Sequence, residues 1–507
     1  MNFLSTHFLS IILFFPALAA LALLFLPKDE NKLLRWFAFG ASLIPFLLSV
    51  SIWFKFESSA AGFQFTEQYQ WYEAIGSSLH LGVDGLSLTM VLLTTLLTPL
   101  AILASFGITE KVKAYMMLFL FLEMGMLGVF MSLDLLVFFV FWEVGLIPMY
   151  FLISQWGSAN RHYASMKFMM YTMGGSLGLL LAIQLLGVLF GTFDLVTLYQ
   201  RWTALEPDST LLGMTVSQVK TIAFWAFTIA FAIKVPVWPF HTWLPDAHTE
   251  APTAGSMILA GVLLKLGAYG FLRLILPLYP FEAKVFAGAL AFLATAAIVF
   301  GAFASFAQTD FKRMVAYSSV NHMGIVILGI AAAGLASGTT DATLALNGAI
   351  LQMFNHGLSA AGMFFLVGVL YDRTHTRNLE ELGGLFPLVP VYGGILIFTS
   401  MASLGLPGLN GFISEFLVVR GAWSIFTIYT AVSMLGLLFT GAYILKGIKN
   451  VLHGPLNEHW AHGEHKLTEI STREILIMAP LMVLILWIGI YPAWILDVIN
   501  RAVVMLF

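Results

Sequence analysis

Long apolar segments recur along almost the whole chain, and they constrain its fold more than any other feature of the sequence. A helix needs about 20 mostly apolar residues to cross the hydrocarbon core of a membrane. Fourteen segments of the 507-residue chain fit that length, and only 10% of all residues are charged. A soluble protein carries about 25% charged residues. We therefore expect an all-α integral membrane protein with about 14 transmembrane helices.

The boundaries of these segments follow from where polar residues begin. The first segment lacks a basic start and a clear small-residue cleavage site, so we interpret it as a retained helix and not as a signal peptide. Proline, glycine and asparagine interrupt the seventh and twelfth segments, which are expected to be two half-helices each. The fourteen segments are 3–26, 33–55, 86–107, 114–132, 134–155, 166–191, 220–239, 252–276, 284–306, 311–331, 343–371, 389–419, 422–448 and 474–500.

Lysine and arginine residues are divided unevenly between the two sides of the predicted membrane. Apart from Lys234 and Lys265, which lie inside segments, fifteen of them fall on one side and seven on the other. Short loops rich in Lys and Arg stay in the cytoplasm. Both termini are therefore expected on the outer side. The seven outer residues are Lys55, Arg201, Lys220, Arg273, Lys284, Arg420 and Arg501.

The two interrupted segments hold matching positions in two possible repeats. Two five-helix units, 114–276 and 284–448, each have the interrupted helix in fourth place. Because five is odd, the second unit would be inverted, and paired broken helices in inverted repeats point to a transport site. We expect two inverted five-helix repeats, each with a broken helix. Three helices in 1–113 precede them, and a cytoplasmic loop with a last helix in 449–507 follows.

Ionisable side chains inside the predicted segments are the strongest functional signal. A charge near the centre of a bilayer costs about 2.5 kcal/mol or more, so it is rarely retained without a function. Burial favours the neutral form of a side chain, whereas a nearby opposite charge favours the charged form. A small movement between Glu143 and Lys234 would therefore change how tightly the lysine holds its proton. The buried set comprises Glu123, Glu143, Lys234, Lys265, His322, His356 and Glu415.

Each of these residues also has an interpretation without proton transfer. Lys265 can extend toward an interface, although it lies near the middle of its segment. Glu143 and Lys234 can form a static ion pair, although buried pairs are a weak source of stability. His322 and His356 can join helices by hydrogen bonds, as polar side chains in membranes do. Glu123 is open to the same explanation.

The composition argues against several kinds of chemistry in this chain. It contains no cysteine, which excludes disulfides, thiolate catalysis and cysteine-bound iron–sulfur clusters. The two histidines, His322 and His356, have no accompanying third nitrogen or thiolate ligand, so no zinc or haem site is expected. The net charge of −3 gives no reason to expect a nucleic acid partner.

Five long strings in the chain resemble one known family. They are SLDLLVFFVFWEVGLIPMYFLI, KVPVWPFHTWLPDAHTEAPTAGSMILAGVLLKLGAYG, AQTDFKRMVAYSSVNHMG, FNHGLSAAGMFFLVG and LGLPGLNGFISEF. They are similar to the antiporter-like membrane subunits of respiratory complex I, and the resemblance covers about residues 80–445. Glu415 stands where the L-type and N-type subunits, and the related sodium/proton antiporter subunits, typically carry lysine. The chain therefore resembles a further type within this family.

The resemblance implies a role for each matching carboxylate and lysine. Glu143 and Lys234 match the pair that gates the channel, and Lys265 matches a central relay lysine. Glu415 matches the exit-side glutamate of the second broken helix. Glu123 matches a glutamate that only some family members have.

The resemblance also implies roles for the histidines. His322 and His356 match the central polar axis that relays protons. His241, Asp246 and His248 follow the first break in the sequence, and we expect them to shape or hydrate that loop. A capped cytoplasmic turn explains these three residues equally well.

By this resemblance the chain would translocate protons in the membrane arm of complex I and couple them to NADH:quinone electron transfer. Flavin, iron–sulfur clusters and quinone would belong to partner subunits, and this chain would hold no cofactor. Its partners would be L-type and N-type antiporter-like neighbours and lipids. The location would be the bacterial cytoplasmic (inner) membrane.

Three other functions stay open at this point. The first is a cation/proton antiporter subunit of the Mrp type, and a membrane-bound hydrogenase subunit is a variant of it. Glu415 argues against the antiporter, because those subunits typically carry lysine there. The third is a membrane scaffold without transport, which leaves the buried carboxylates and lysines unexplained. The sequence does not identify the electron donor or the quinone, and it does not decide between proton and sodium.

Overall fold

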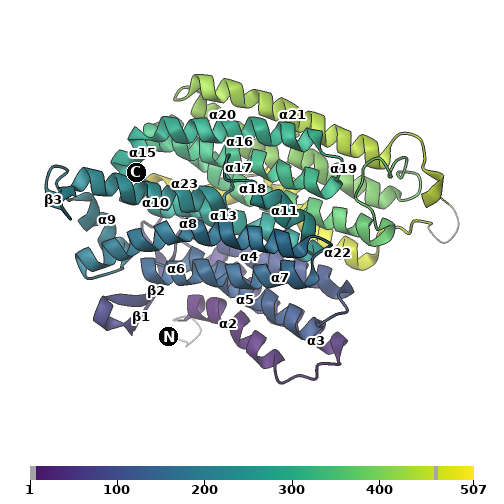
Figure 1. Cartoon of the computed structure of the whole chain (residues 1–507), viewed down its shortest axis with the longest axis horizontal. Coiled ribbons are helices and arrows are strands. Elements are labelled where there is room, and N and C mark those ends of the chain that lie inside the picture. The colour runs from purple at the N-terminus through teal and green to yellow at the C-terminus, as the bar shows by residue number, and fades with distance from the viewer. Residues whose placement is uncertain (1–6, 462–465, 507) are drawn as a thin grey trace.

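The computed structural model describes residues 7–461 and 466–506, and most of them lie in helices that run side by side along one long axis (Figure 1). The helices of the first half are α2 (Phe8–Leu23), α3 (Asn31–Lys55), α4 (Gly85–Ala104), α5 (Val112–Met131), α6 (Leu135–Val144), α7 (Leu146–Trp156), α8 (Arg161–Phe190), α9 (Leu195–Thr203), α10 (Val216–Lys234), α11 (Trp243–Glu250), α12 (Thr253–Ile258), α13 (Leu264–Gly270) and α14 (Leu276–Leu278). The helices of the second half are α15 (Pro280–Val285), α16 (Ala287–Ala307), α17 (Phe311–Leu335), α18 (Thr340–Thr374), α19 (Pro390–Leu404), α20 (Asn410–Trp423), α21 (Thr427–Leu452), α22 (Thr472–Ile490) and α23 (Ala493–Met505).

Twelve helical stretches in the described part of the chain are long and apolar enough to cross a membrane. The shorter apolar helices Phe8–Leu23 and Pro390–Leu404 fall at the first and twelfth predicted segments. The all-helical membrane fold is thus confirmed, whereas the count of fourteen crossings and the inverted repeats stay predictions.

The last predicted segment, 474–500, differs from the expectation of one helix. Helix α22 ends at Ile490 and α23 begins at Ala493. Pro492 lies between them, and proline disfavours the helical conformation of the residue that precedes it. The single helix was therefore wrong, because the apolar run continues through a proline that ends the helix.

Both interrupted segments are broken where the sequence predicts. Helix α10 ends at Lys234, and α11 begins only at Trp243. Trp243 donates a hydrogen bond of 2.9 Å from its Nε1 to the carbonyl of Ile233, one of the groups that the break exposes. In the second break, Gly405 and Gly408 have positive φ angles of 80° and 93°. Glycine adopts this conformation without the steric penalty of a side chain.

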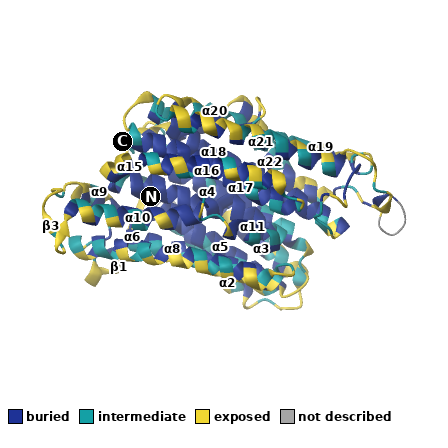
Figure 2. Ribbon diagram, turned by 45° about the horizontal axis from the view of Figure 1, so that its top comes forward, coloured by how far each residue is buried: buried dark blue, intermediate teal, exposed yellow. Residues whose placement is uncertain are grey.

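The helical rod from Thr253 to Leu278 contains two π-helical turns that the sequence did not predict. Residues Leu259–Leu263 (η3) and Phe271–Ile275 (η4) are π-helical and flank α13. Every residue in the apolar window of this rod is buried, and the same is true of α18. Figure 2 shows this buried centre, with the exposed residues on the outer helices and loops. The two most enclosed rods therefore carry Lys265 and His356.

One end of the bundle, on the left of Figure 1, is closed by short elements. The antiparallel hairpin β1 (Gln64–Tyr72) and β2 (Ser77–Val83) lies there, with the one-turn helix η1 (Glu73–Ile75) between its strands. The smaller hairpin β3 (Thr210–Leu211) and β4 (Met214–Thr215) and the end of α23 lie at the same end. We call it the hairpin end. Two further short turns are η2 (Ser105–Gly107) and η5 (Glu458–Trp460).

Candidate functional site

The first broken helix ends at Lys234, and its ammonium group lies inside the protein. The residue is only 2% exposed. Its Nζ lies 5.1 Å from the centre of the Trp142 ring, and Trp142 donates a hydrogen bond of 3.0 Å to the hydroxyl of Ser176. A cation over the face of a tryptophan is attracted by the ring electrons. This contact holds the lysine in place without neutralising its charge.

Glu143 lies near Lys234 but is not bonded to it. Within the described residues, neither side chain forms an ion pair within 4.0 Å. One carboxylate oxygen of Glu143 is buried without a hydrogen-bond partner among the described residues, although its charge still attracts the ammonium. The structure therefore does not contain the static ion pair, and the carboxylate of Glu143 is separated from the ammonium group of Lys234.

Lys265 lies at the centre of the bundle between the two π-helical turns. It is completely buried. Its Nζ donates to the carbonyl of Ala260 in the widened turn η3 and lies 2.7 Å from Nδ1 of His356. The ammonium group is thus placed by two acceptors on neighbouring helical rods. The interpretation in which Lys265 extends toward a membrane interface is wrong, because both contacts of its ammonium group lie in the interior.

The two histidines continue the row from Lys265. The rings of His356 and His322 have their centres 5.5 Å apart, and both residues are 3% exposed. Nδ1 of His322 lies 2.9 Å from Oε1 of Glu415, and its Nε2 lies 3.3 Å from the hydroxyl of Tyr443. Nε2 of His356 is buried without a hydrogen-bond partner in the described residues. A neutral imidazole has one donor and one acceptor nitrogen, so each ring can accept a proton on one side and release one on the other.

Glu415, in the second half of the second broken helix, ends the row. Its carboxylate accepts hydrogen bonds from His322 and, at 3.1 Å, from the amide of Gln352. Ser414 donates to the amide oxygen of Gln352 at 2.5 Å. Asn355 donates to Ser414 at 3.0 Å and to the backbone carbonyl of Asn410 at 2.7 Å. These amide and hydroxyl groups fix the carboxylate against α18.

The predicted residues therefore form two groups. Lys265, His356, His322 and Glu415 lie in one row with short contacts, while Glu143 and Lys234 lie beside it on α6 and α10. The two groups meet through Gly267. A methyl group added to Gly267 would lie 2.7 Å from the carbonyl oxygen of Phe231 and 3.0 Å from Cβ of Lys234. The helix of Lys234 thus packs directly on the rod of Lys265.

Comparison with known proteins shows to which family the chain belongs. The family model described as "NADH:quinone oxidoreductase/Mrp antiporter, TM" matches residues 132–440. NADH-quinone oxidoreductase subunit M of Rhodobacter capsulatus is 40% identical over 98% of this chain and 96% of its own length. The chain belongs to this NADH:quinone oxidoreductase/Mrp antiporter family. A more distant member, NAD(P)H-quinone oxidoreductase chain 4 3 of Trichormus variabilis, is 38% identical over 97% of this chain and 90% of its own.

Solved structures agree with the family. A chain of respiratory complex I from Thermus thermophilus with bound NADH superimposes with a TM-score of 0.84 at 27% identity, covering 98% of this chain and 99% of that one. The Mrp complex from Dietzia sp. gives a TM-score of 0.81 at 23% identity, over 99% of this chain and 52% of that one. At that identity the likeness shows the fold alone.

The secondary residues suggested by the family resemblance form no hydrogen bond with the row in the described part of the chain, although His248 lies close enough to Lys265 and His356 to interact with them electrostatically. Asp246 forms ion pairs with Lys167 at 2.7 Å and with Arg313 at 3.2 Å. His248 is completely buried and stacks on Phe364 with ring centres 4.2 Å apart. Asp246 therefore joins α11 to α8 and α17, and both Asp246 and His248 lie in this helix and not in the expected loop.

His241 and Glu123 have fewer contacts. His241 lies beside the ring of Tyr317 with centres 6.2 Å apart. Glu123 is completely buried in α5, and neither carboxylate oxygen has a hydrogen-bond partner in the described residues. Neither is joined by a hydrogen bond to the row from Lys265 to Glu415.

Several polar residues of the site were missed in the sequence. Gln352 and Asn355 precede His356 on α18 by four residues and one residue. Tyr443 and Ser414 contact His322 and Gln352 from other helices. Amide side chains inside a predicted transmembrane segment were a usable signal, because a buried amide needs partners. The tyrosine carried no such signal.

Proposed function

We propose that this chain is the M-type, proton-translocating subunit of the membrane arm of a complex-I-like NADH:quinone oxidoreductase. The observation that carries the proposal is the buried row Lys265–His356–His322–Glu415, whose members lie on four different helical elements within short contact. Four buried titratable side chains have little structural value, since each costs desolvation energy. A path for protons explains why they are retained.

The geometry of Glu143 and Lys234 suggests how the path is gated. Separated from the carboxylate, the buried ammonium loses the attraction that offsets its desolvation, and release of its proton becomes favourable. When the two groups approach, the charged lysine is favoured again. A change of a few ångströms between charges is worth a few kcal/mol at an effective dielectric of about 20. This is comparable with moving one charge across a potential of about 100 mV, about 2.3 kcal/mol.

The proposal extends to partners and orientation. The relatives named as subunits belong to multi-subunit quinone oxidoreductases. We propose that this chain adjoins L-type and N-type neighbours in such a complex and that the redox cofactors lie in other subunits. The uneven Lys and Arg count supports a location of the hairpin end and both termini outside the bacterial cytoplasmic membrane. We keep residues 114–276 and 284–448 as the two inverted units, since each contains one of the broken helices.

An Mrp-type antiporter subunit is the second candidate, because the family description covers it. Two observations favour the quinone oxidoreductase. The relatives reported above at 38% and 40% identity are quinone oxidoreductase subunits, whereas the Mrp complex shares 23%. Position 415 carries a glutamate, which accepts hydrogen bonds from His322 and Gln352. The antiporter subunits typically carry a lysine at this position. Sodium-dependent transport by the purified complex, without NADH, would support the antiporter instead.

The decisive experiment replaces Glu143 by Gln and, separately, Lys234 by Ala in the assembled complex. We expect each variant to lose most of its NADH-driven proton pumping, since the gate can no longer alternate. Electron transfer from NADH to an artificial acceptor should stay unchanged. Glu143→Asp, which retains a carboxylate, is the matched control and should keep part of the pumping. Normal pumping in both test variants would refute the gating role.

A further inference from the structure

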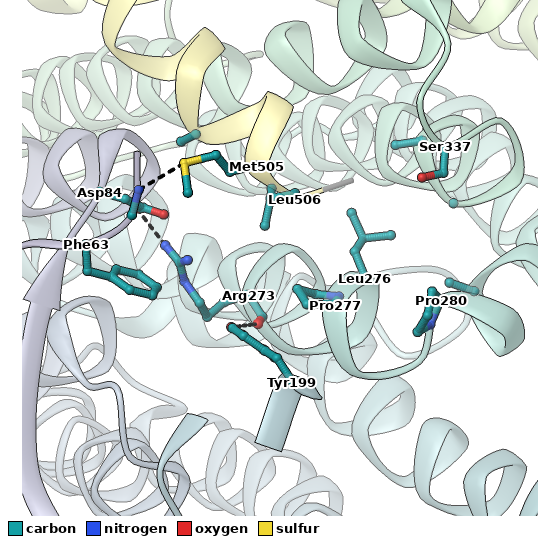
Figure 3. A pocket seen from close by; sticks show the side chains of 15 residues that line it. Phe63, Asp84, Tyr199, Arg273, Leu276, Pro277, Pro280, Ser337, Met505 and Leu506 are labelled. Carbon is teal, nitrogen blue, oxygen red and sulfur yellow. Dashed lines mark hydrogen bonds and ion pairs between the residues drawn. The ribbon is translucent and has the colours of Figure 1, made fainter. Parts of the chain in front are cut away.

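A cavity opens at the hairpin end, away from the row from Lys265 to Glu415. Its volume is about 370 Å³, which is room for about ten water molecules. Its lining comes from the loop before β1, from Asp84 just before α4, from α9 and α23, and from the rod of Lys265, with Leu276 and Leu506 among the apolar residues (Figure 3). Elements from both halves of the chain thus enclose one space that faces the outer side in the proposed orientation.

The inner wall of this cavity carries an ion pair between α4 and the rod of Lys265. Nη2 of Arg273 lies 2.6 Å from Oδ1 of Asp84, and Nε of Arg273 donates to the hydroxyl of Tyr269 at 3.1 Å. The Cζ atom of Arg273 lies 4.9 Å from the centre of the Phe63 ring and 5.3 Å from the centre of the Tyr269 ring. Figure 3 shows Arg273 pointing toward Asp84 with Phe63 beside it. Arg273 is 2% exposed, so it fills its position tightly.

The charge of this pair is fixed. Burial works to raise the pKa of Asp84, but the Arg273 guanidinium and the hydrogen bonds from Ser87 outweigh it and hold that pKa below its usual value. Asp84 is therefore a carboxylate at neutral pH. An arginine does not release its proton in a protein. Because buried ion pairs add little stability by themselves, this pair needs another explanation.

The rod connects the pair to the relay lysine. Arg273 follows Lys265 by eight residues, which is about 12 Å along a helix. Tyr269 lies between them, and its hydroxyl is bonded to Arg273 and donates at 2.9 Å to the carbonyl of Phe130. The side chains of Lys265, Tyr269 and Arg273 thus follow one another toward the outer side, and the cavity begins at Arg273. The arginine is the one of these three side chains that cannot titrate.

We infer that the cavity is the outer water-filled end of a half-channel toward Lys265, and that Arg273 is the fixed charge that closes it to protons. A guanidinium blocks proton movement in two ways. It cannot accept a proton, and its positive charge raises the energy of a second cation nearby, as an arginine does in water-selective channels. Asp84 balances its charge, and hydrogen bonds to Tyr269 and Ser87 also hold it in that position. One part of the inference rests on the proposed function: if the row carries protons, the barrier at Arg273 prevents them from leaking back.

The test measures passive proton leak into liposomes that contain the purified complex, with an imposed pH gradient and without NADH. Arg273→Lys keeps the positive charge and its carboxylate partner, but a buried lysine can lose its proton. We expect its leak to rise about ten-fold, the change that a barrier lower by about 1.4 kcal/mol produces. Asp84→Asn keeps the arginine and an N-cap residue for α4, so we expect no rise in its leak.

A purely structural pair predicts the reverse order, because Arg273→Lys preserves an ion pair and Asp84→Asn removes it. Equal leaks, or a larger leak in Asp84→Asn, would overturn the inference. The double variant Asp84→Asn/Arg273→Gln leaves no unpaired charge from this buried pair. It replaces the single variants in the leak measurement if one of them does not assemble. Its leak should also rise, and a leak equal to that of the unmodified complex contradicts the barrier. The measurement uses no NADH, so it stands even if the Glu143 and Lys234 variants pump normally.

A labelling experiment tests the water-filled cavity separately. The chain has no cysteine, so one introduced thiol is unique within it. Leu276→Cys places the thiol on the cavity wall, where the residue is 7% exposed. Its neighbour Leu274 is completely buried and does not line the cavity. A charged, membrane-impermeant thiol reagent added from the outer side should modify Leu276→Cys and leave Leu274→Cys unmodified. No adduct on Leu276→Cys contradicts an open cavity.

Discussion

The chemistry of an ionisable side chain inside a membrane depends on which atoms it contacts. Lys265 has two acceptors and His322 has a carboxylate partner, whereas Glu143 and Glu123 contain oxygens without a partner in the described residues. Hydrogen bonds from neighbouring groups hold a carboxylate in one orientation, whereas a carboxylate oxygen without a donor is not placed in this way. The glutamates in this chain therefore differ in how the surrounding side chains position them, although they have the same side chain.

Glu415 provides the prediction at this scale. Glu415→Gln keeps the shape of the side chain and an acceptor for His322 but cannot bind and release a proton. We expect it to lose most of the pumping with little change in melting temperature. Glu415→Asp, which still titrates, should retain part of the pumping. The measurement is the ratio of protons pumped to electrons transferred in liposomes, and equal ratios in the two variants would show that titration at this position is not needed.

At the scale of helices, the site depends on departures from regular α-helix. The two breaks expose backbone groups next to Lys234 and before Asn410, and two π-helical turns flank the α13 segment that carries Lys265. A π-helical turn shifts the direction of the side chains that follow it. The lysine can therefore reach a carbonyl in the preceding turn and a histidine on another helix at once.

Gly267 provides the prediction for helix packing. A methyl group at this position would lie 2.7 Å from the carbonyl of Phe231, which forces the Lys234 helix away from the rod of Lys265. We expect Gly267→Ala to lower the unfolding free energy by about 1 to 3 kcal/mol, as overpacking does, and to reduce pumping. Gly40→Ala is the control, since nothing lies within 4 Å of an added methyl there. The same melting temperature in both variants would contradict this close contact.

At the scale of the whole molecule, ion pairs hold distant segments together at both ends of the bundle. Asp246 joins α11, which follows the first break, to α8 and α17. At the hairpin end, Asp194 accepts a hydrogen bond from the backbone of Thr197 at the start of α9 and lies 2.8 Å from Nδ1 of His80 on β2. These pairs fix the short elements around an apolar core.

Asp194 gives a prediction for stability against pH. Burial works to raise its pKa, but the hydrogen bonds from His80 and Thr197 outweigh it, and the pKa lies below its ordinary value. The stabilisation is therefore present above the ordinary pKa, about 4, and is lost as the pH falls below it. At pH 7, Asp194→Asn should lower the unfolding free energy by about 1 to 3 kcal/mol. Melting curves from pH 7 to pH 3 should show the difference from the unmodified protein shrinking, and a constant difference would contradict a role for the ionised carboxylate of Asp194.

The sequence by itself determined the membrane fold, the positions of both breaks and the identities of the four row residues. These depend on local properties, namely the length of an apolar run, a proline inside it and a charge within it. Residue 265 was recognisable because a lysine in an apolar segment needs a reason to be there. The end of α22 before Pro492 was equally local and was overlooked.

Only the tertiary structure decided which of these residues meet. Lys265 and His356 are 91 positions apart in the chain, and Asp84 and Arg273 are 189 apart. Whether such residues touch depends on the rotation of each helix about its axis and on the closeness of packing. Packing is set by many small side-chain contacts at once, and no local pattern records it. For the same reason the separation of Glu143 from Lys234, the amide groups around Glu415 and the cavity behind Arg273 appeared only in three dimensions.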